Sequence, residues 1–196
     1  MKNYLYLALA GTILSGGIAF AQTSSYSIDP AHSEVDFSIR HMAISTVHGR
    51  FALKGGTIQL NPQDITRSSV EAVIDVPSVD TGTAQRDTHL KSADFFDATK
   101  FPTAVFRSEH ITRSGDGYDV AGNLTLHGVT KQVVLHMDPP SKDQIGMDGK
   151  PRRGFSATTT LHRQDFGLTW NGTVKSGDNV LGDDVKMTFD IEAGQN

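Results

Sequence analysis

Three histidines lie within seventeen positions near the start of the chain, at His32, His41 and His48. An imidazole can ligate a metal ion or act as an acid or base near neutral pH, so this segment has the residue types for either chemistry. His32 and His41 are nine residues apart, which is about 30 Å along an extended strand. One metal ion therefore cannot bind both while that segment stays extended. His48 belongs to the following segment.

The rest of the chain offers no motif that would complete such a site. The other five histidines form neither an i, i+4 pair nor the H-E-x-x-H spacing of a zinc helix. There is no G-x-S-x-G, no Walker loop and no G-x-G-x-x-G. The acidic fragments GDNVLGDD and DQIGMDG lack the register of a calcium loop. We therefore predict no catalytic residue, no bound metal and no cofactor, and a protein that is not an enzyme.

The first 21 residues have the features of a secretory signal peptide. Lys2 is followed by an apolar run from Tyr4 to Ile18 and then by the small-x-small triplet Ala19-Phe20-Ala21. The apolar run is shorter than the ~20 residues that a membrane span needs, so no stable membrane insertion is expected. We predict cleavage after Ala21 and a periplasmic location, with residues 22–196 forming one domain.

Composition narrows the remaining possibilities. Removal of Lys2 leaves 17 of the 18 basic residues against 22 acidic ones, a formal net charge of −5, and no block of like charges stands out. Nucleic-acid binding is therefore not expected. The chain has no cysteine, which excludes thiol catalysis, thiolate metal sites and disulfides. An exported domain of this length must then be stable through its hydrophobic core.

The elements that position these residues are mostly strands. Val35, Phe37 and Ile39 alternate with polar residues, a period-two pattern typical of a strand buried on one face. The same alternation recurs at residues 70–76, 118–126, 155–162 and 185–192. His127-Gly128-Val129-Thr130 predicts a hairpin turn. Gly55-Gly56, where the apolar positions change parity, predicts a bulge.

One segment, residues 83–97, reads as helical, and residues 138–153 read as one long mobile loop. One short helix cannot cover a sheet of roughly eight strands. The sheet must therefore fold back on itself as a barrel or a sandwich. The class predicted from the residues is all-β and antiparallel.

Four segments in order resemble the YceI-like family of exported bacterial proteins associated with polyisoprenoid and lipid binding. They are YSIDPAHSEVDFSIRHMAISTVHGRF at 26–51, RDTHLKSADFFDATKFPTAVF at 86–106, LTLHGVTKQVVL at 124–135 and RQDFGL at 163–168. The resemblance implies an extended antiparallel eight-stranded lipocalin-like β-barrel with one short helix. It also implies that the barrel interior binds, stores or transports a long-chain apolar ligand, a polyisoprenoid, quinone or fatty amide or acid, with a link to stress.

An eight-stranded barrel is just wide enough to be filled by side chains or to hold one small ligand. Small inward candidates (Ala72, Gly122, Ala157 and Thr159) stand among large ones, which fits either a filled taper or a cavity. With about 0.8 kcal/mol per buried methylene, twenty chain carbons could contribute on the order of 16 kcal/mol before ordering costs. The residues that we expect to line the ligand tail are Phe37, Phe51, Ile74, Leu126, Leu135, Phe155, Trp170 and Phe189.

The polar head of the ligand is assigned to one mouth of the barrel, with His41, Arg50, His89 and Arg163 as candidates. Helix 83–97 could be a lid or could pack on the outside. Two other classes stay open: an isoprenoid- or quinone-modifying enzyme using His89 or His41, and a histidine metal-binding export protein. The outward apolar positions Val73 and Val134 leave a homodimer open.

Overall fold

Residues 24–60 form one long hairpin whose two arms are each interrupted once. In the computed structural model, which describes residues 23–175, 177 and 179–196, the first arm is β1 (Ser24–Ile28) and β2 (Glu34–His41). The second arm is β3 (Ser45–Phe51) and β4 (Leu53–Leu60). β2 pairs with β3 and β1 with β4, both antiparallel. The predicted signal peptide lies outside the described residues.

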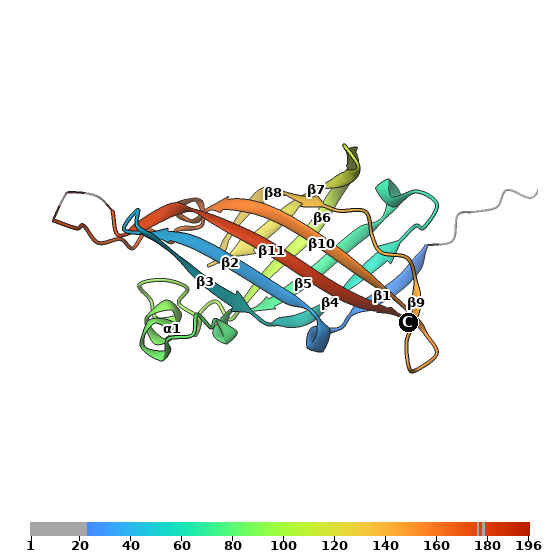
Figure 1. The fold of residues 1–196 in the computed structure, drawn as a ribbon, viewed down its shortest axis with the longest axis horizontal. Coiled ribbons are helices and arrows are strands. Elements are labelled where there is room, and N and C mark those ends of the chain that lie inside the picture. The colour runs from blue at the N-terminus through green and yellow to red at the C-terminus, as the bar shows by residue number, and fades with distance from the viewer. Residues whose placement is uncertain (1–22, 176, 178) are drawn as a thin grey trace, which may run out of the picture.

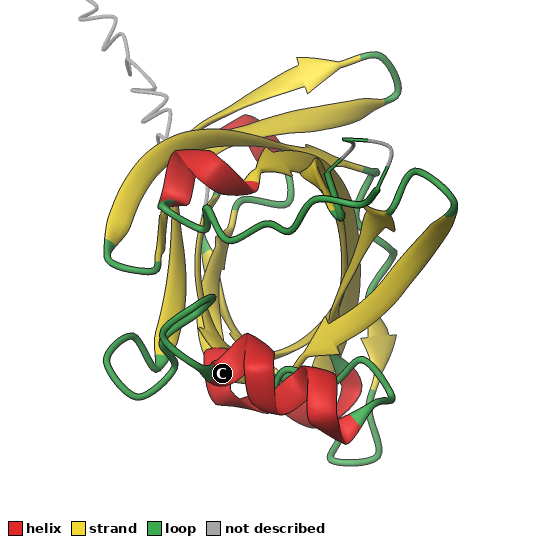
Figure 2. Cartoon of the chain, turned by 90° about the vertical axis from the view of Figure 1, so that its left-hand side faces the viewer, coloured by secondary structure: helices red, strands yellow, loops and turns green. Residues whose placement is uncertain are grey.

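The remaining strands continue the sheet until it meets its own beginning. They are β5 (Ser69–Asp75), β6 (Thr103–Ser114), β7 (Gly117–Leu126), β8 (Val129–Met137), β9 (Gln144–Ile145), β10 (Pro151–His162) and β11 (Leu181–Gln195). β11 pairs with β10 on one edge and with β2 and then β1 on the other. Counting each interrupted arm once and omitting the two-residue β9, the wall has eight strands around a ring (Figures 1 and 2). The predicted antiparallel barrel is confirmed.

The period-two patterns explain which side chains fill the ring. Along β7, Tyr118, Val120 and Leu124 are buried and point inward, while the residues between them are more exposed. Gly122 holds the fourth inward position, and a Cβ there would come within 2.7 Å of the Phe106 ring. The space that a larger side chain would need at this position is therefore already filled by the Arg107 carbonyl and the Phe106 ring.

The structure contains both the hairpin turn and the bulge that the sequence predicts. His127 and Gly128 both have positive φ angles, 52° and 75°, between the paired ends of β7 and β8. Two such residues form the type I′ turn that matches strand twist in a two-residue hairpin loop. The β4–β5 ladder shifts register between Leu53 and Gly55, where Gly55 has φ 134°. This is the predicted bulge, and it returns Ile58 to the inward face.

Two sequence predictions need correction. The helix is shorter than residues 83–97, because α1 (Ala84–Lys91) is capped by Ser92 and a series of turns follows. The segment 138–153 is not one long loop, because β9 pairs with the start of β10 and Asp143 forms an ion pair with Arg153. None of the described helices is both long and apolar enough to cross a membrane.

Candidate functional site: an apolar cavity along the barrel axis

The barrel encloses an elongated cavity of about 490 Å³. Small-molecule sites typically have volumes of about 300–1,000 Å³, so this space is large enough for a ligand. Its wall consists almost entirely of inward-facing aliphatic and aromatic side chains from the strands. Such a lining offers burial of apolar surface as its main source of binding free energy.

All eight residues predicted for the ligand tail line this cavity: Phe37, Phe51, Ile74, Leu126, Leu135, Phe155, Trp170 and Phe189. The seven strand residues share a wall because inward positions alternate along every strand, whereas Trp170 reaches it from the loop between β10 and β11. Of the small inward candidates, Ala72, Ala157 and Thr159 also line it. The structure thus brings the predicted set together around one space, and their contact with a ligand stays a prediction.

The two ends of the cavity differ in how far their side chains are covered. Near the β6–β7 turn, Leu60, Ile111 and Val120 are buried. Near the β2–β3 turn, the lining residues Ile39 and Val47 are only half-buried. At these positions the cavity wall is better covered at the first end, which we call the closed end, than at the second, which we call the mouth.

α1 and the turns after it form one side of the mouth (Figures 1 and 2). The His89 ring packs edge-on against Trp170 and Phe95, with ring centroids 5.2 and 5.0 Å apart. Deeper in, Phe96 packs edge-on against Phe51 at 5.4 Å. α1 and its following turns therefore contribute to the cavity wall itself rather than covering the outside of the barrel.

Arg163 lines the cavity, but most of its hydrogen-bonding capacity is already used. Its Nε donates to the carbonyl of Gly182 at 2.9 Å, and its Nη1 donates to the carbonyls of Leu168 and Trp170. Its Nη2 donates to Asp183 Oδ1 at 3.1 Å. Four of the five N–H donors of the buried guanidinium thus bind residues 168–170 and 182–183. We therefore remove Arg163 from the ligand-head candidates.

Arg50 does not line the cavity. It pairs with Asp36 across β2 and β3, on the face opposite Phe37 and Phe51. Its guanidinium is 3.3 Å from Asp80 and 3.9 Å from Glu34, in solvent. Its outward parity places it away from the cavity, so the structure does not support Arg50 as a ligand-head residue.

His41 and His89 do line the mouth. His89 Nε2 is 2.9 Å from Asp94 Oδ2, which is the kind of pair that the enzyme hypothesis would use. Histidine–aspartate pairs also occur on the outer surface of the described protein, at His32–Asp29, His136–Asp119 and His162–Asp184. The pair at His89 is therefore no specific indication of catalysis.

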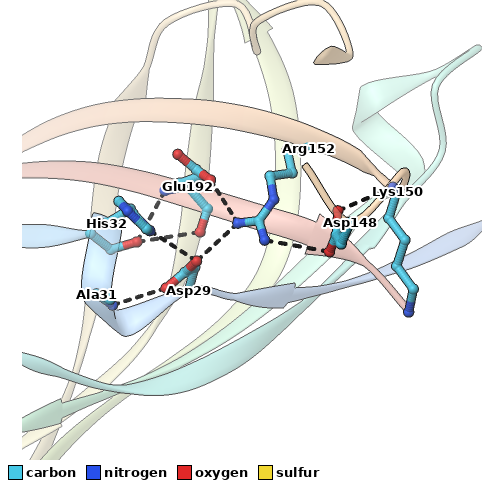
Figure 3. A network of polar contacts seen from close by, with 8 residues as sticks. Asp29, Ala31, His32, Asp148, Lys150, Arg152 and Glu192 are labelled. Carbon is cyan, nitrogen blue, oxygen red and sulfur yellow. Dashed lines mark hydrogen bonds and ion pairs between the residues drawn. The ribbon is translucent and has the colours of Figure 1, made fainter. Parts of the chain in front are cut away.

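A second polar cluster joins η1 to the start of β10 and the last part of β11, away from the mouth (Figure 3). Asp29, His32 and Glu192 place ligand atoms within 4.8 Å of one another, as a metal site would. Arg152 Nη1, however, donates to Asp29 at 2.9 Å and to Glu192 at 2.8 Å. The guanidinium already supplies the positive charge that a metal ion would bring, so this cluster does not favour the metal-binding hypothesis.

The same contacts perturb one carboxyl group. Hydrogen bonds from His32, then Arg152 and the Ala31 amide, lower the pKa of Asp29 from 3.8 to about 2. Asp29 and Glu192 in turn raise the pKa of Arg152. The cluster is thus a set of mutually satisfied charges. We refer to Asp29, His32, Arg152 and Glu192 as the clasp.

A closed antiparallel barrel around an elongated apolar cavity defines a class of β-barrel suited to binding small apolar ligands. Within that class, a sequence model described as the YceI-like domain matches residues 26–193. A UPF0312 protein of Vibrio cholerae is 38% identical over 85% of this chain and 88% of its own length. Protein YceI of Salmonella newport is 36% identical over 86% and 87%. The chain belongs to the YceI-like family.

Solved structures agree on the fold. The YceI protein of Campylobacter jejuni superposes with a TM-score of 0.66 at 30% identity, covering 80% of this chain and 90% of that one. A polyisoprenoid binding domain from Saccharophagus degradans gives a TM-score of 0.62 at 19% identity, covering 88% and 99%. At that identity the second likeness supports the barrel fold alone.

Proposed function

We propose that the protein binds one long apolar chain in the barrel cavity, without catalysis. The observation that carries this proposal is the cavity of about 490 Å³, whose strand walls present aliphatic and aromatic side chains. A water-filled space with such a lining would be costly, whereas an apolar chain would replace that water at a gain of about 0.8 kcal/mol per buried methylene.

Family membership supports the same conclusion. The Saccharophagus degradans domain with the same fold is described as polyisoprenoid binding. For this chain we propose the general class of ligand only: a long-chain lipid such as a polyisoprenoid, a quinone, or a fatty amide or acid. Carriage or storage of that lipid in the periplasm, after export directed by residues 1–21, completes the proposal.

Native mass spectrometry of protein exported to its own periplasm tests the proposal directly. We expect a discrete added mass that solvent extraction removes and identifies. Phe37→Asp and Phe155→Asp place a carboxylate on the cavity wall, so both should lose that mass.

The matched control is Thr158→Asp, which puts the same charge on the exposed face of β10. It should keep the bound lipid. Unchanged lipid occupancy in folded Phe37→Asp and Phe155→Asp proteins, or a bare polypeptide mass for the wild type under gentle conditions, would contradict the assignment of the cavity as the binding site.

A further inference from the structure

The mouth contains a second arginine that the sequence did not single out. Arg86, in the first turn of α1, is half-buried and lines the cavity. Its Nε donates to Thr81 Oγ1 at 2.7 Å, and its Nη2 donates to the Thr81 carbonyl at 2.8 Å and to Thr83 Oγ1 at 3.3 Å. These three bonds use one edge of the guanidinium and leave both N–H groups of Nη1 without a partner among the described residues.

The bonds to Thr81 fix the direction of the Arg86 side chain. The Thr81 hydroxyl donates to Asp87 Oδ1 at 2.5 Å, and the Thr81 amide donates to the same oxygen at 2.9 Å. Because the hydroxyl gives its one proton to Asp87, its lone pairs are available to accept from Arg86. Asp87 thus fixes Thr81, and Thr81 fixes the Arg86 guanidinium. A side chain that is already ordered costs less entropy when it binds a ligand.

Three arginines near this part of the barrel differ in whether a carboxylate forms an ion pair with them. Arg163 has Asp183 at 3.1 Å, and Arg50 has Asp80 at 3.3 Å. Among the ion pairs of the described residues, no carboxylate oxygen comes within 4.0 Å of the Arg86 nitrogens. A half-buried cation beside an apolar cavity gains from a partner of opposite charge, because its own solvation is incomplete.

We propose that Arg86 binds an anionic head group, a carboxylate or a phosphate, of a single-chain lipid whose tail lies in the cavity. The head-group oxygens would accept from the two N–H groups of Nη1, in the charge-assisted geometry that arginine offers to planar or tetrahedral anions. His89, three residues along α1, lines the same cavity and stands beside this site. The inference rests on the proposed function and specifies the chemistry of the ligand head.

Three probes of one chain length separate head from tail: palmitate, hexadecyl phosphate and hexadecanol. Trp170, the one tryptophan of the chain, lies at the mouth and reports binding by its fluorescence. The wild type, freed of lipid by solvent extraction, should bind at least one of the two anions about 10- to 100-fold more tightly than hexadecanol. Arg86→Gln should abolish that preference while its affinity for hexadecanol stays unchanged.

Arg50→Gln is the matched control, since it removes the same charge from an arginine outside the cavity, and it should keep the wild-type preference. The difference between palmitate and hexadecyl phosphate identifies which anion the site takes. Equal affinity of the wild type for all three probes would overturn the role of Arg86 but leave the cavity function intact. An equal loss for all three probes in Arg86→Gln would make Arg86 a structural residue instead. Failure of the wild type to bind any probe would contradict the proposed function itself.

Discussion

The two ends of the barrel are built from the same alternating strands but treat their apolar residues differently. At the closed end, the inward side chains of Leu60 and Val120 are only 1% and 2% exposed. At the mouth, Val47 occupies an equivalent inward position and remains half-buried. The closed end therefore behaves as a conventional core, whereas the mouth keeps apolar surface available.

The polar groups follow the same division. At the closed end the clasp joins η1 (Pro30–His32), β10 and β11 through Arg152, which forms ion pairs with three carboxylates, those of Asp29, Glu192 and Asp148 (Figure 3). At the mouth Arg86 has only neutral partners. Strand alternation is therefore enough to form the barrel. The polar side chains differ between its ends, with paired charges in the clasp and an arginine without a charged partner at the mouth.

The largest expected effect comes from placing a charge at each end in turn. Val120→Asp buries a carboxylate without a partner, so it should lower the free energy of unfolding by more than about 3 kcal/mol or prevent folding. Val47→Asp leaves the carboxylate near solvent at the mouth and should cost about 1 kcal/mol. Urea denaturation of both variants measures the two losses. Equal losses would show that the mouth is packed as tightly as the closed end.

The clasp predicts how stability depends on pH. The pKa of Asp29 is about 2 in the folded protein against its usual 3.8. A group with a lowered folded pKa binds its proton more readily when unfolded, so its contribution is complete above about pH 4 and is lost as the pH falls toward 2. Asp29→Asn should therefore flatten the decline in unfolding free energy across that window.

Asp116→Asn serves as the control for this pH series. Asp116 is an exposed carboxyl in the β6–β7 turn that has no ion pair among the described residues. Its replacement should leave the decline between pH 4 and 2 as steep as in the wild type. An Asp29→Asn protein with the wild-type slope would mean that the clasp adds nothing to folding stability.

The barrel and most of the cavity wall could be predicted from sequence because parity is a local property. Phe37 and Phe51 alternate with polar neighbours, and that pattern fixes their face wherever the strand is placed. The same argument places Arg50 outside, because it immediately precedes the inward Phe51. The outward position of Arg50 could thus have been inferred from the sequence alone.

The chemistry of the mouth could not be predicted in this way. Three N–H groups of Arg163 donate to the carbonyls of Leu168, Trp170 and Gly182. These carbonyls come near the guanidinium only in the folded chain. The role of Arg86 depends on where a short helix rests against a barrel, and no strand parity applies there. The sequence shows which residues are arginines. Only tertiary contacts determine which arginine has an N–H group left to bind a ligand.

The smallest expected effect concerns the backbone at the rim of the mouth. In the β2–β3 turn, Met42 and Ala43 have φ angles of 53° and 55°, and the Ile44 amide donates to the His41 carbonyl at 3.0 Å. This is a type I′ turn built without the glycine that it favours, and each left-handed residue costs roughly 1 kcal/mol.

Ala43→Gly should therefore raise the free energy of unfolding by about 0.5–1 kcal/mol, because relief of the left-handed strain outweighs the extra freedom of glycine in the unfolded chain. The β7–β8 turn at the same end of the barrel gives the reverse experiment. Gly128 has φ 75°, and a Cβ there would lie 2.6 Å from the Phe101 ring, so Gly128→Ala should destabilise the protein. Urea midpoints measure both changes. A loss of stability in Ala43→Gly would mean that this turn holds the mouth by contacts of the Ala43 methyl group rather than despite its backbone strain.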